Sequence, residues 1–185
     1  MSVNAGPAMD FFELIHARRS IRVFTSAPVA EEQLTRILAA ANQAPSAGNL
    51  QAYVILVVRD AATRAKLSLA ALNQESLAAA PVVLAFFAHQ QISASKYQHR
   101  GVELYAVQDA TVACAYAQLA ATALGLGSVW VGAFDDAAVK QALKAQTDWR
   151  PVALLPIGCP AETPPATPRR TLSVTAREAG TVSAG

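Results

Sequence analysis

Apolar residues occur along this chain in two patterns, a helical periodicity and short continuous runs. Helical spacing predicts a short helix that begins after Asp10 and ends before Arg18. Further helices are expected within residues 28–45, 61–80, 102–124 and 135–145, the fourth of these five helices being capped by Gly125. Continuous apolar runs rich in β-branched residues predict strands over 53–58, 81–87, 128–132 and 152–158. The run 53–58 is typical of a central strand that is covered on both faces.

Two segments follow neither pattern. Residues 89–101 are polar and irregular, which predicts a loop of functional length. Residues 160–168 contain four prolines, and we expect an extended C-terminal arm over 161–185 that carries Arg169 and Arg170. No repeat or long linker divides the chain, so residues 1–185 are expected to form one domain. The irregular order of helices and strands favours an α+β sandwich.

The composition changes this picture by suggesting a partner. Hydrophobic residues make up 53% of the chain and charged residues only 15%, which favours a second subunit that covers part of the surface. The net charge of +2 arises from well-mixed acids and bases, so a nucleic-acid partner is not expected.

No segment predicts export or membrane insertion. Residues 1–10 lack a basic start and an apolar run, and the apolar region 104–126 is interrupted by Gln108, Asp109 and Gln118. We therefore expect a cytoplasmic protein without a membrane partner. Because a buried carboxylate is costly unless it is paired, Asp109 is expected to accept hydrogen bonds from the backbone or from an arginine.

Cysteines and histidines give no sign of a metal site. Cys114 and Cys159 stand singly and far apart, and both are expected to be buried, inert thiols. The three histidines have no ligand spacing, so no bound metal is expected.

The densest chemistry lies just after the first predicted helix, at Arg18, Arg19, Ser20 and Arg22. Three guanidinium groups and a hydroxyl within five residues form a set of donors that suits a phosphate group. The alternative is a solvated helix end with ordinary surface arginines.

A second polar segment, residues 45–51, separates the second predicted helix from the first strand. Its small residues Pro45, Ala47 and Gly48 would let the backbone approach a flat ligand. The side chains of Ser46, Asn49 and Gln51 can donate and accept hydrogen bonds, as the edge of a heterocyclic ring requires. The alternative is a plain turn between helix and strand.

Five segments in this order resemble the nitroreductase family of FMN-dependent oxidoreductases. They are Arg-Arg-Ser-Ile-Arg at 18–22, Pro-Ser-Ala-Gly-Asn-Leu-Gln at 45–51, and residues 104–110, 123–134 and 155–160. The resemblance extends from Phe11 to Leu172. It implies a mostly antiparallel central sheet flanked by helices, and an intertwined homodimer with two FMN molecules, each held at the subunit interface.

The resemblance also implies a reaction. Electrons would pass from NAD(P)H through FMN to a nitroaromatic, a quinone or a similar planar acceptor, in a ping-pong mechanism. Hydride transfer would be carried by flavin atom N5, so no side chain is expected to be catalytic. A specialised flavin-dependent dehydrogenase or oxidase of the same fold, or a flavin-binding sensor without turnover, remains an alternative.

Cofactor contacts follow from the family's motifs. Arg18, Arg19, Ser20 and Arg22 would hold the phosphate and ribityl chain, and Arg169 or Arg170 would close over the same phosphate. The family often has a lysine shortly before that arginine, where this chain has Thr167 and Pro168. The flavin ring would contact Pro45, Ser46, Ala47, Asn49 and Gln51. A backbone amide in the segment Val131, Gly132 and Ala133 would face N5, unless this segment is a simple strand end.

The segment 95–101 resembles one that lies near the active site in part of the family. Lys96, Tyr97, Arg100 and Tyr105 are its candidate substrate-binding residues. They could attract the phosphates of NAD(P)H or an anionic acceptor, or they could form hydrogen bonds across the dimer.

Overall fold

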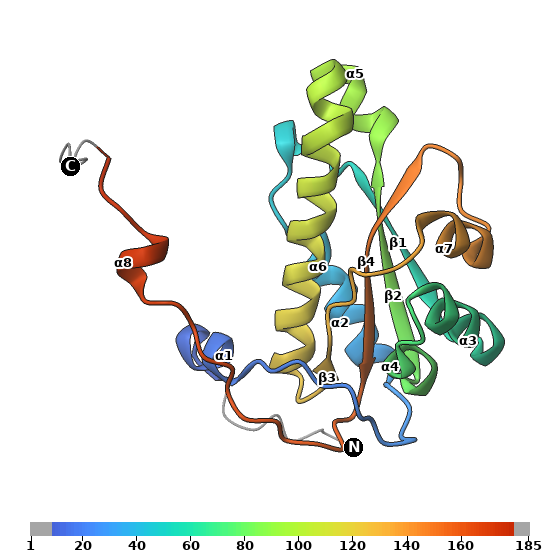
Figure 1. Cartoon of the computed structure of the whole chain (residues 1–185), viewed down its shortest axis with the longest axis vertical. Coiled ribbons are helices and arrows are strands. Elements are labelled where there is room, and N and C mark those ends of the chain that lie inside the picture. Colours follow the sequence, from blue (N-terminus) through green and yellow to red (C-terminus); the bar gives the residue numbers. More distant parts are fainter. Residues whose placement is uncertain (1–8, 180–185) are drawn as a thin grey trace.

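A four-stranded antiparallel sheet forms the centre of the protein (Figure 1). This computed structural model describes residues 9–179, so the expectations for residues 1–8 and 180–185 lie outside the described residues. The strands are β1 (Tyr53–Val58), β2 (Val82–His89), β3 (Gly127–Ser128) and β4 (Trp149–Gly158), in the order β1-β2-β4-β3. The mostly antiparallel sheet expected from the sequence is confirmed.

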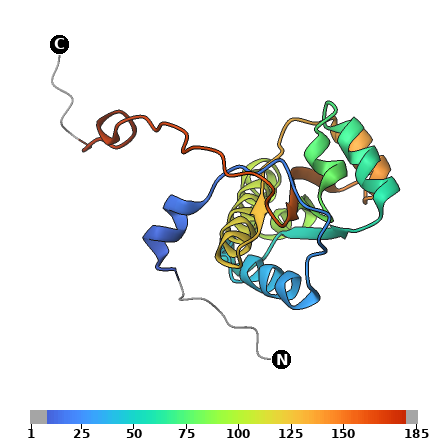
Figure 2. The same cartoon turned by 90° about the horizontal axis from the view of Figure 1, so that it is seen from below.

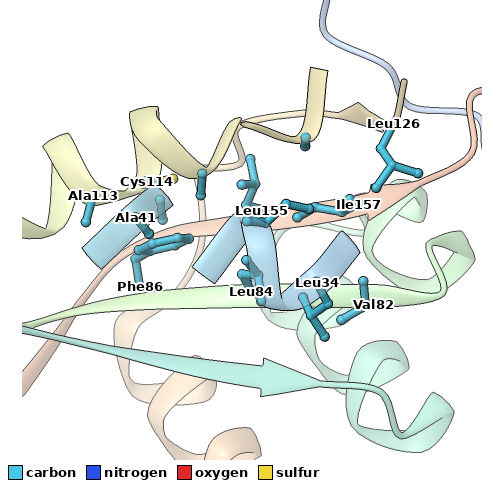
Figure 3. Packing of buried hydrophobic residues seen from close by; sticks show 14 of the residues in the cluster. Leu34, Ala41, Val82, Leu84, Phe86, Ala113, Cys114, Leu126, Leu155 and Ile157 are labelled. Carbon is cyan, nitrogen blue, oxygen red and sulfur yellow. The ribbon is translucent and has the colours of Figure 1, made fainter. Parts of the chain in front are cut away.

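The sheet lies between two layers of helices (Figure 1). Alternate residues of β2 point to opposite faces, so Val82, Leu84 and Phe86 join one core cluster while Val83, Ala85 and Phe87 join the other. Helices α2 (Glu31–Asn42) and α6 (Ala106–Ala123) cover the first face, as the packing in Figure 3 shows. Helices α3 (Ala61–Ala70), α4 (Glu75–Ala79) and α7 (Asp136–Leu143) cover the second.

Strand β1 is not the central strand that its apolar run suggested. It pairs only with β2 in this sheet, and Val57 is 40% exposed. A continuous apolar run indicates that helices cover both faces of a strand, but it does not indicate how many strands lie beside it. The position of β1 within the sheet was therefore wrongly predicted.

Residues 61–80 form two helices rather than one. The interruption falls at Leu72 and Asn73, which both adopt positive φ angles of 57° and 60°. Such residues cannot continue a right-handed helix, and the chain turns there before α4 begins.

The prediction of a loop over 89–101 was wrong. Strand β2 extends to His89, and helix α5 (Gln90–Arg100), which is kinked at Gln98 with a φ of 48°, leads through a π-helical turn (Gly101–Tyr105) into α6. A Cβ atom on Gly101 would lie 2.5 Å from the carbonyl oxygen of Ser93, so two stretches of backbone pack together without a side chain between them. A contact between backbones does not require apolar side chains at helical spacing. The hydrophobic pattern of the sequence therefore did not predict this helix.

The predicted strand 128–132 is shorter and irregular. Only Gly127 and Ser128 form β3, while Val131 makes an isolated pair with Leu154 on β4. Gly125, at a φ of 74°, ends α6 as expected and donates its amide hydrogen to the carbonyl of Thr122.

Both ends of the described chain project from this body (Figure 2). Helix α1 (Phe11–Ala17) is capped by Asp10 as predicted, yet it has no buried residue, and Phe12 is 75% exposed. The arm carries a short helix α8 (Leu172–Thr175), in which Leu172 is 80% exposed. Cys114 is buried as expected, whereas Cys159 is partly exposed. Within residues 9–179, every helix is too short or too polar to cross a bilayer.

Candidate functional site

One cavity is lined by most of the arginines that the sequence analysis singled out. This cavity of about 480 Å³ lies between the exit of α1 and the C-terminal arm. Its polar lining comprises His16, Arg18, Arg19, Ser20, Arg22, Thr167 and Arg169. Arg170 does not line it, so the structure favours Arg169 of the two arm residues considered.

Main-chain pairing brings these residues together. The segment after α1 runs beside the sheet, where Ser20 pairs in parallel with Ser128 and the amide of Ile21 donates to the Ser128 carbonyl at 2.9 Å. A little further on, Phe24 pairs with Pro160 at the start of the arm. The arginine segment therefore has strand β3 on one side and the root of the arm on the other.

The cavity has an excess of positive charge. Within residues 9–179, none of Arg18, Arg22 and Arg169 has a carboxylate within ion-pair distance. Burial, the charge of Arg169 and the charge of Arg19 together lower the pKa of Arg18. Such a set of converging, mutually repelling guanidinium groups fits a phosphate dianion, which would accept their hydrogen bonds and neutralise their charge.

The segment 131–133 continues the sheet edge to which Ser20 is joined. Val131 is buried and paired with Leu154, whereas Gly132 and Ala133 are exposed. The backbone amide of Gly132 makes no hydrogen bond to another residue of the described part of the chain. Gly132 follows Ser128 by four residues, a span of at most about 14 Å. The free amide of Gly132 therefore lies within about 14 Å of Ser128. Ser128 pairs with Ser20, which lines the arginine cavity.

The polar loop 46–51 is a strained turn rather than a plain connection. Gly48, Asn49 and Gln51 have positive φ angles of 58°, 57° and 44°, a conformation that non-glycine residues seldom adopt. The Ser46 Oγ accepts hydrogen bonds from the Gln51 amide at 3.0 Å and from Gln51 Nε2 at 3.1 Å. Gln51 Nε2 also donates to Asn49 Oδ1 at 2.6 Å. These bonds fix the side chains that were predicted to face a ring.

Asp109 holds this loop at both ends. Its Oδ1 accepts a hydrogen bond from the Ala47 amide at 2.9 Å, and its Oδ2 accepts one from the Ala52 amide at 3.3 Å. The expectation that this carboxylate binds backbone is confirmed, but its link to the polar loop was not foreseen. The only signal in the sequence was a lone acid in an apolar helix.

The end of α5 lies directly over the same loop. A Cβ atom on Gly48 would lie 2.5 Å from Tyr97 Oη and 2.7 Å from Lys96 Nζ, so both side chains touch the glycine. Tyr97 packs edge-on against Tyr105 with ring centroids 4.9 Å apart. Arg100 Nε donates to Tyr105 Oη at 2.9 Å, and its guanidinium lies 5.3 Å from that ring's centroid. The structure therefore brings the four candidate substrate-binding residues together, next to the predicted ring loop.

The two clusters lie at opposite ends of α6. The loop is bound to Asp109 in the first turn of this helix, whereas Ser20 pairs with Ser128 just beyond its last turn. At about 1.5 Å per residue, the helix rises roughly 20 Å between Asp109 and Ala123. Figure 1 shows α5 beside the upper end of α6 and α1 beside its lower end. One chain does not bring the arginine cavity and the polar loop together.

Comparison with known proteins identifies relatives of this arrangement. Residues 15–76 and 68–159 match the sequence profile of the nitroreductase family. A Thermus thermophilus protein named NADH dehydrogenase is 35% identical over 183 residues, covering 84% of this chain and 89% of its own. A 5,6-dimethylbenzimidazole synthase of Rhodospirillum rubrum is 32% identical over 178 residues and covers 82% of each chain. The solved NADPH:FMN oxidoreductase of Vibrio harveyi, in complex with NAD+, has a TM-score of 0.85 at 28% identity, covering 94% of this chain and 79% of its own.

The antiparallel sheet between two helical layers and the matching profile define an α+β oxidoreductase. The chain belongs to the nitroreductase family, as its motifs predicted. At the level of this family, the expectation of an NAD(P)H-dependent enzyme with FMN as cofactor is confirmed as well.

Proposed function

We propose that this protein is a homodimeric FMN-dependent reductase that takes electrons from NAD(P)H and delivers them to a planar acceptor such as a nitroaromatic or a quinone. The observation that carries the proposal is the convergence of Arg18, Arg22 and Arg169 on a cavity of about 480 Å³, where none of the three guanidinium groups has a carboxylate of residues 9–179 within ion-pair distance. Such a cavity is suited to the FMN phosphate.

The residues of the site would have distinct tasks. Arg18, Arg19, Ser20, Arg22 and Arg169 would bind the phosphate and the ribityl chain, and the exposed amide of Gly132 would donate toward N5 of the ring. Bound FMN would supply the redox chemistry by accepting a hydride from NAD(P)H and passing electrons on in a second half-reaction. The protein would contribute fixed hydrogen bonds and a slot that excludes water.

A homodimer would complete the site. Because the polar loop and the arginine cavity lie at opposite ends of α6, a flavin bound at the cavity would take its ring contacts from the loop of a second copy. Helix α1 and the arm support this proposal, since both extend from the body with exposed large apolar residues (Figure 2). Pro45, Ser46, Ala47, Asn49 and Gln51 would thus contact the flavin held by the other subunit.

The end of α5 would face the acceptor or the reduced nicotinamide cofactor. Lys96 and Arg100 make no ion pair within residues 9–179, so their charge is available to a phosphate or to an anionic acceptor. Hydrogen bonding of the same residues across the dimer is the competing role. We place this reaction in the cytoplasm.

A second candidate function has support from relatives that are named synthases. One of them is the Rhodospirillum rubrum protein, which covers 82% of this chain, compared with 84% for the Thermus thermophilus protein. A specialised flavin-dependent dehydrogenase or oxidase on the same scaffold would use the same FMN contacts with another substrate over the ring.

The visible spectrum of the purified protein distinguishes these functions. If the reductase proposal is correct, the protein shows flavin bands that bleach within seconds when NADH or NADPH is added without oxygen. Flavin bands that persist would favour the specialised enzyme or a sensor. A colourless protein that does not bind added FMN would contradict the flavin site itself.

A further inference from the structure

Asp109 is a buried carboxylate without a cationic partner. Its side chain is 3% exposed, and within residues 9–179 no lysine or arginine lies within ion-pair distance of it. Its partners are the amides of Ala47 and Ala52, one on each oxygen. Burying a charge without a cationic partner costs desolvation free energy, and two hydrogen bonds from backbone amides offset only part of that cost. A residue that served the fold alone would gain little from this arrangement.

The two amides mark the ends of the strained polar loop. Between them lie three residues with positive φ angles, Gly48, Asn49 and Gln51. A strained turn of this kind persists only where its surroundings determine it, and here a single carboxylate holds both its entry and its exit. Because Asp109 is on α6, the loop is fixed to the longest helix among residues 9–179.

We propose that Asp109 is a positioning residue for the flavin ring. It would act through the loop, by holding the amides of Asn49 and Gln51 in the geometry that binds the ring before any flavin arrives. This inference rests on the proposed function. In the dimer proposed above, Asp109 of one subunit would act on the flavin whose phosphate is bound by the other.

Asp109→Asn is the informative change, because it keeps the shape of the side chain. The carboxamide retains one acceptor oxygen and turns an NH2 group toward the second amide, so one end of the loop is released. We expect the dissociation constant for flavin to rise about tenfold, the loss of one charge-assisted hydrogen bond.

Two flavins separate ring contacts from phosphate contacts. Riboflavin lacks the phosphate but has the same ring. Asp109→Asn should therefore raise the dissociation constants for riboflavin and for FMN by the same factor. Arg18→Ala should weaken the binding of FMN far more than that of riboflavin, because Arg18 would bind the phosphate that riboflavin lacks. Gln118→Ala serves as the control, since Gln118 is also a buried polar residue of α6 but lies nine residues beyond Asp109, about 14 Å further along the helix.

The outcomes are distinct. If Asp109→Asn lowers only the melting temperature of the apoprotein and the folded fraction binds both flavins as tightly as the wild type, Asp109 is purely structural and the proposal is wrong. If the wild-type protein binds neither flavin, the proposed function fails and this inference fails with it.

Hydrogen exchange of the wild-type protein tests the same inference without a variant. We expect the amides of Ala47 and Ala52 to be protected in the apoprotein, because Asp109 already binds them. Protection that arises only after FMN is added would show that the loop is ordered by the flavin, which overturns the proposal even if Asp109→Asn does not fold.

Discussion

The carboxylate of Glu162 accepts a hydrogen bond from the backbone amide of Val23 at 3.0 Å. The same oxygen also accepts one from the amide of Arg22 at 2.5 Å, and Ala161 donates to the Val23 carbonyl at 2.9 Å. The root of the C-terminal arm is thereby fastened to the arginine segment. Arg169 reaches the arginine cavity on a chain that is anchored beside Arg22, so the position of Arg169 depends on Glu162, which does not line the cavity.

This anchor predicts a pH dependence. The amides of Arg22 and Val23 lower the pKa of Glu162, so the contact stabilises the arm above the usual carboxyl pKa and is lost as the pH falls through the lowered value. We expect FMN affinity of the wild type to decrease as the pH is lowered below about 4.3. Glu162→Gln should show weaker FMN binding already at neutral pH and a flatter pH profile, measured by flavin fluorescence. Glu32→Gln, an exposed acid on α2, is the control.

Arg18→Ala tests the phosphate cavity. A charge-assisted hydrogen bond contributes about 1.5–3 kcal/mol, so the dissociation constant for FMN should rise about 10- to 100-fold. The apoprotein should melt no lower than the wild type, because Arg18 is surrounded by the like charges of Arg169 and Arg19. Arg36→Ala removes an exposed arginine from α2 and should leave FMN binding unchanged. An equal effect of both substitutions would exclude a specific phosphate site.

Mixed dimers test whether each flavin is shared between subunits. In a dimer of one Arg18→Ala subunit and one Gln51→Ala subunit, one site would carry both defects and the other neither. We expect tagged, purified mixed dimers to hold one tightly bound FMN and to be active at FMN concentrations that are too low to load either parent dimer. If both residues served the flavin of their own subunit, every site would carry one defect and no activity would return.

Alanine substitutions at two glycines with positive φ angles distinguish the effect of backbone strain from the effect of side-chain packing. Gly48→Ala and Gly125→Ala each place a side chain in the left-handed region, which costs about 1–2 kcal/mol of folding free energy. A Cβ atom on Gly125 would meet nothing within 4 Å, whereas one on Gly48 would displace Tyr97 and Lys96. Urea unfolding should therefore show a loss for both variants, while only Gly48→Ala alters the KM for NAD(P)H or the acceptor. Unchanged kinetics in Gly48→Ala would remove the end of α5 from the substrate site.

Thiol labelling tests the packing of α6 against the sheet. Burial raises the pKa of the Cys114 thiol well above its usual value, and Cys114 lies in the core cluster shown in Figure 3. Cys159 is partly exposed. A maleimide reagent should label Cys159 in the native protein and Cys114 only after unfolding, as read by mass spectrometry. Rapid native labelling of Cys114 would contradict the packing described here.

Local patterns predicted the elements that consist mainly of apolar residues. The continuous run 81–87 predicted β2 (Val82–His89), which is buried on both faces, and the apolar, alanine-rich stretch before Gly125 predicted α6. The sequence pattern did not predict helix α5. Its place depends on the backbone contact between Ser93 and Gly101 and on the packing of Ile92, neither of which creates a periodic pattern.

The sequence by itself determined the family, the α+β class and the residue types of the candidate site, since the arginines at 18–22 and the amides of Asn49 and Gln51 carry their chemistry wherever the chain places them. The tertiary structure alone decided that Arg169 rather than Arg170 joins the cavity, that Asp109 holds the polar loop, and that cavity and loop lie at opposite ends of α6. The physical reason is the range of the forces involved. Helical and strand periodicity reflect interactions between residues close in sequence, whereas these contacts join residues far apart whose meeting depends on the path of the whole chain.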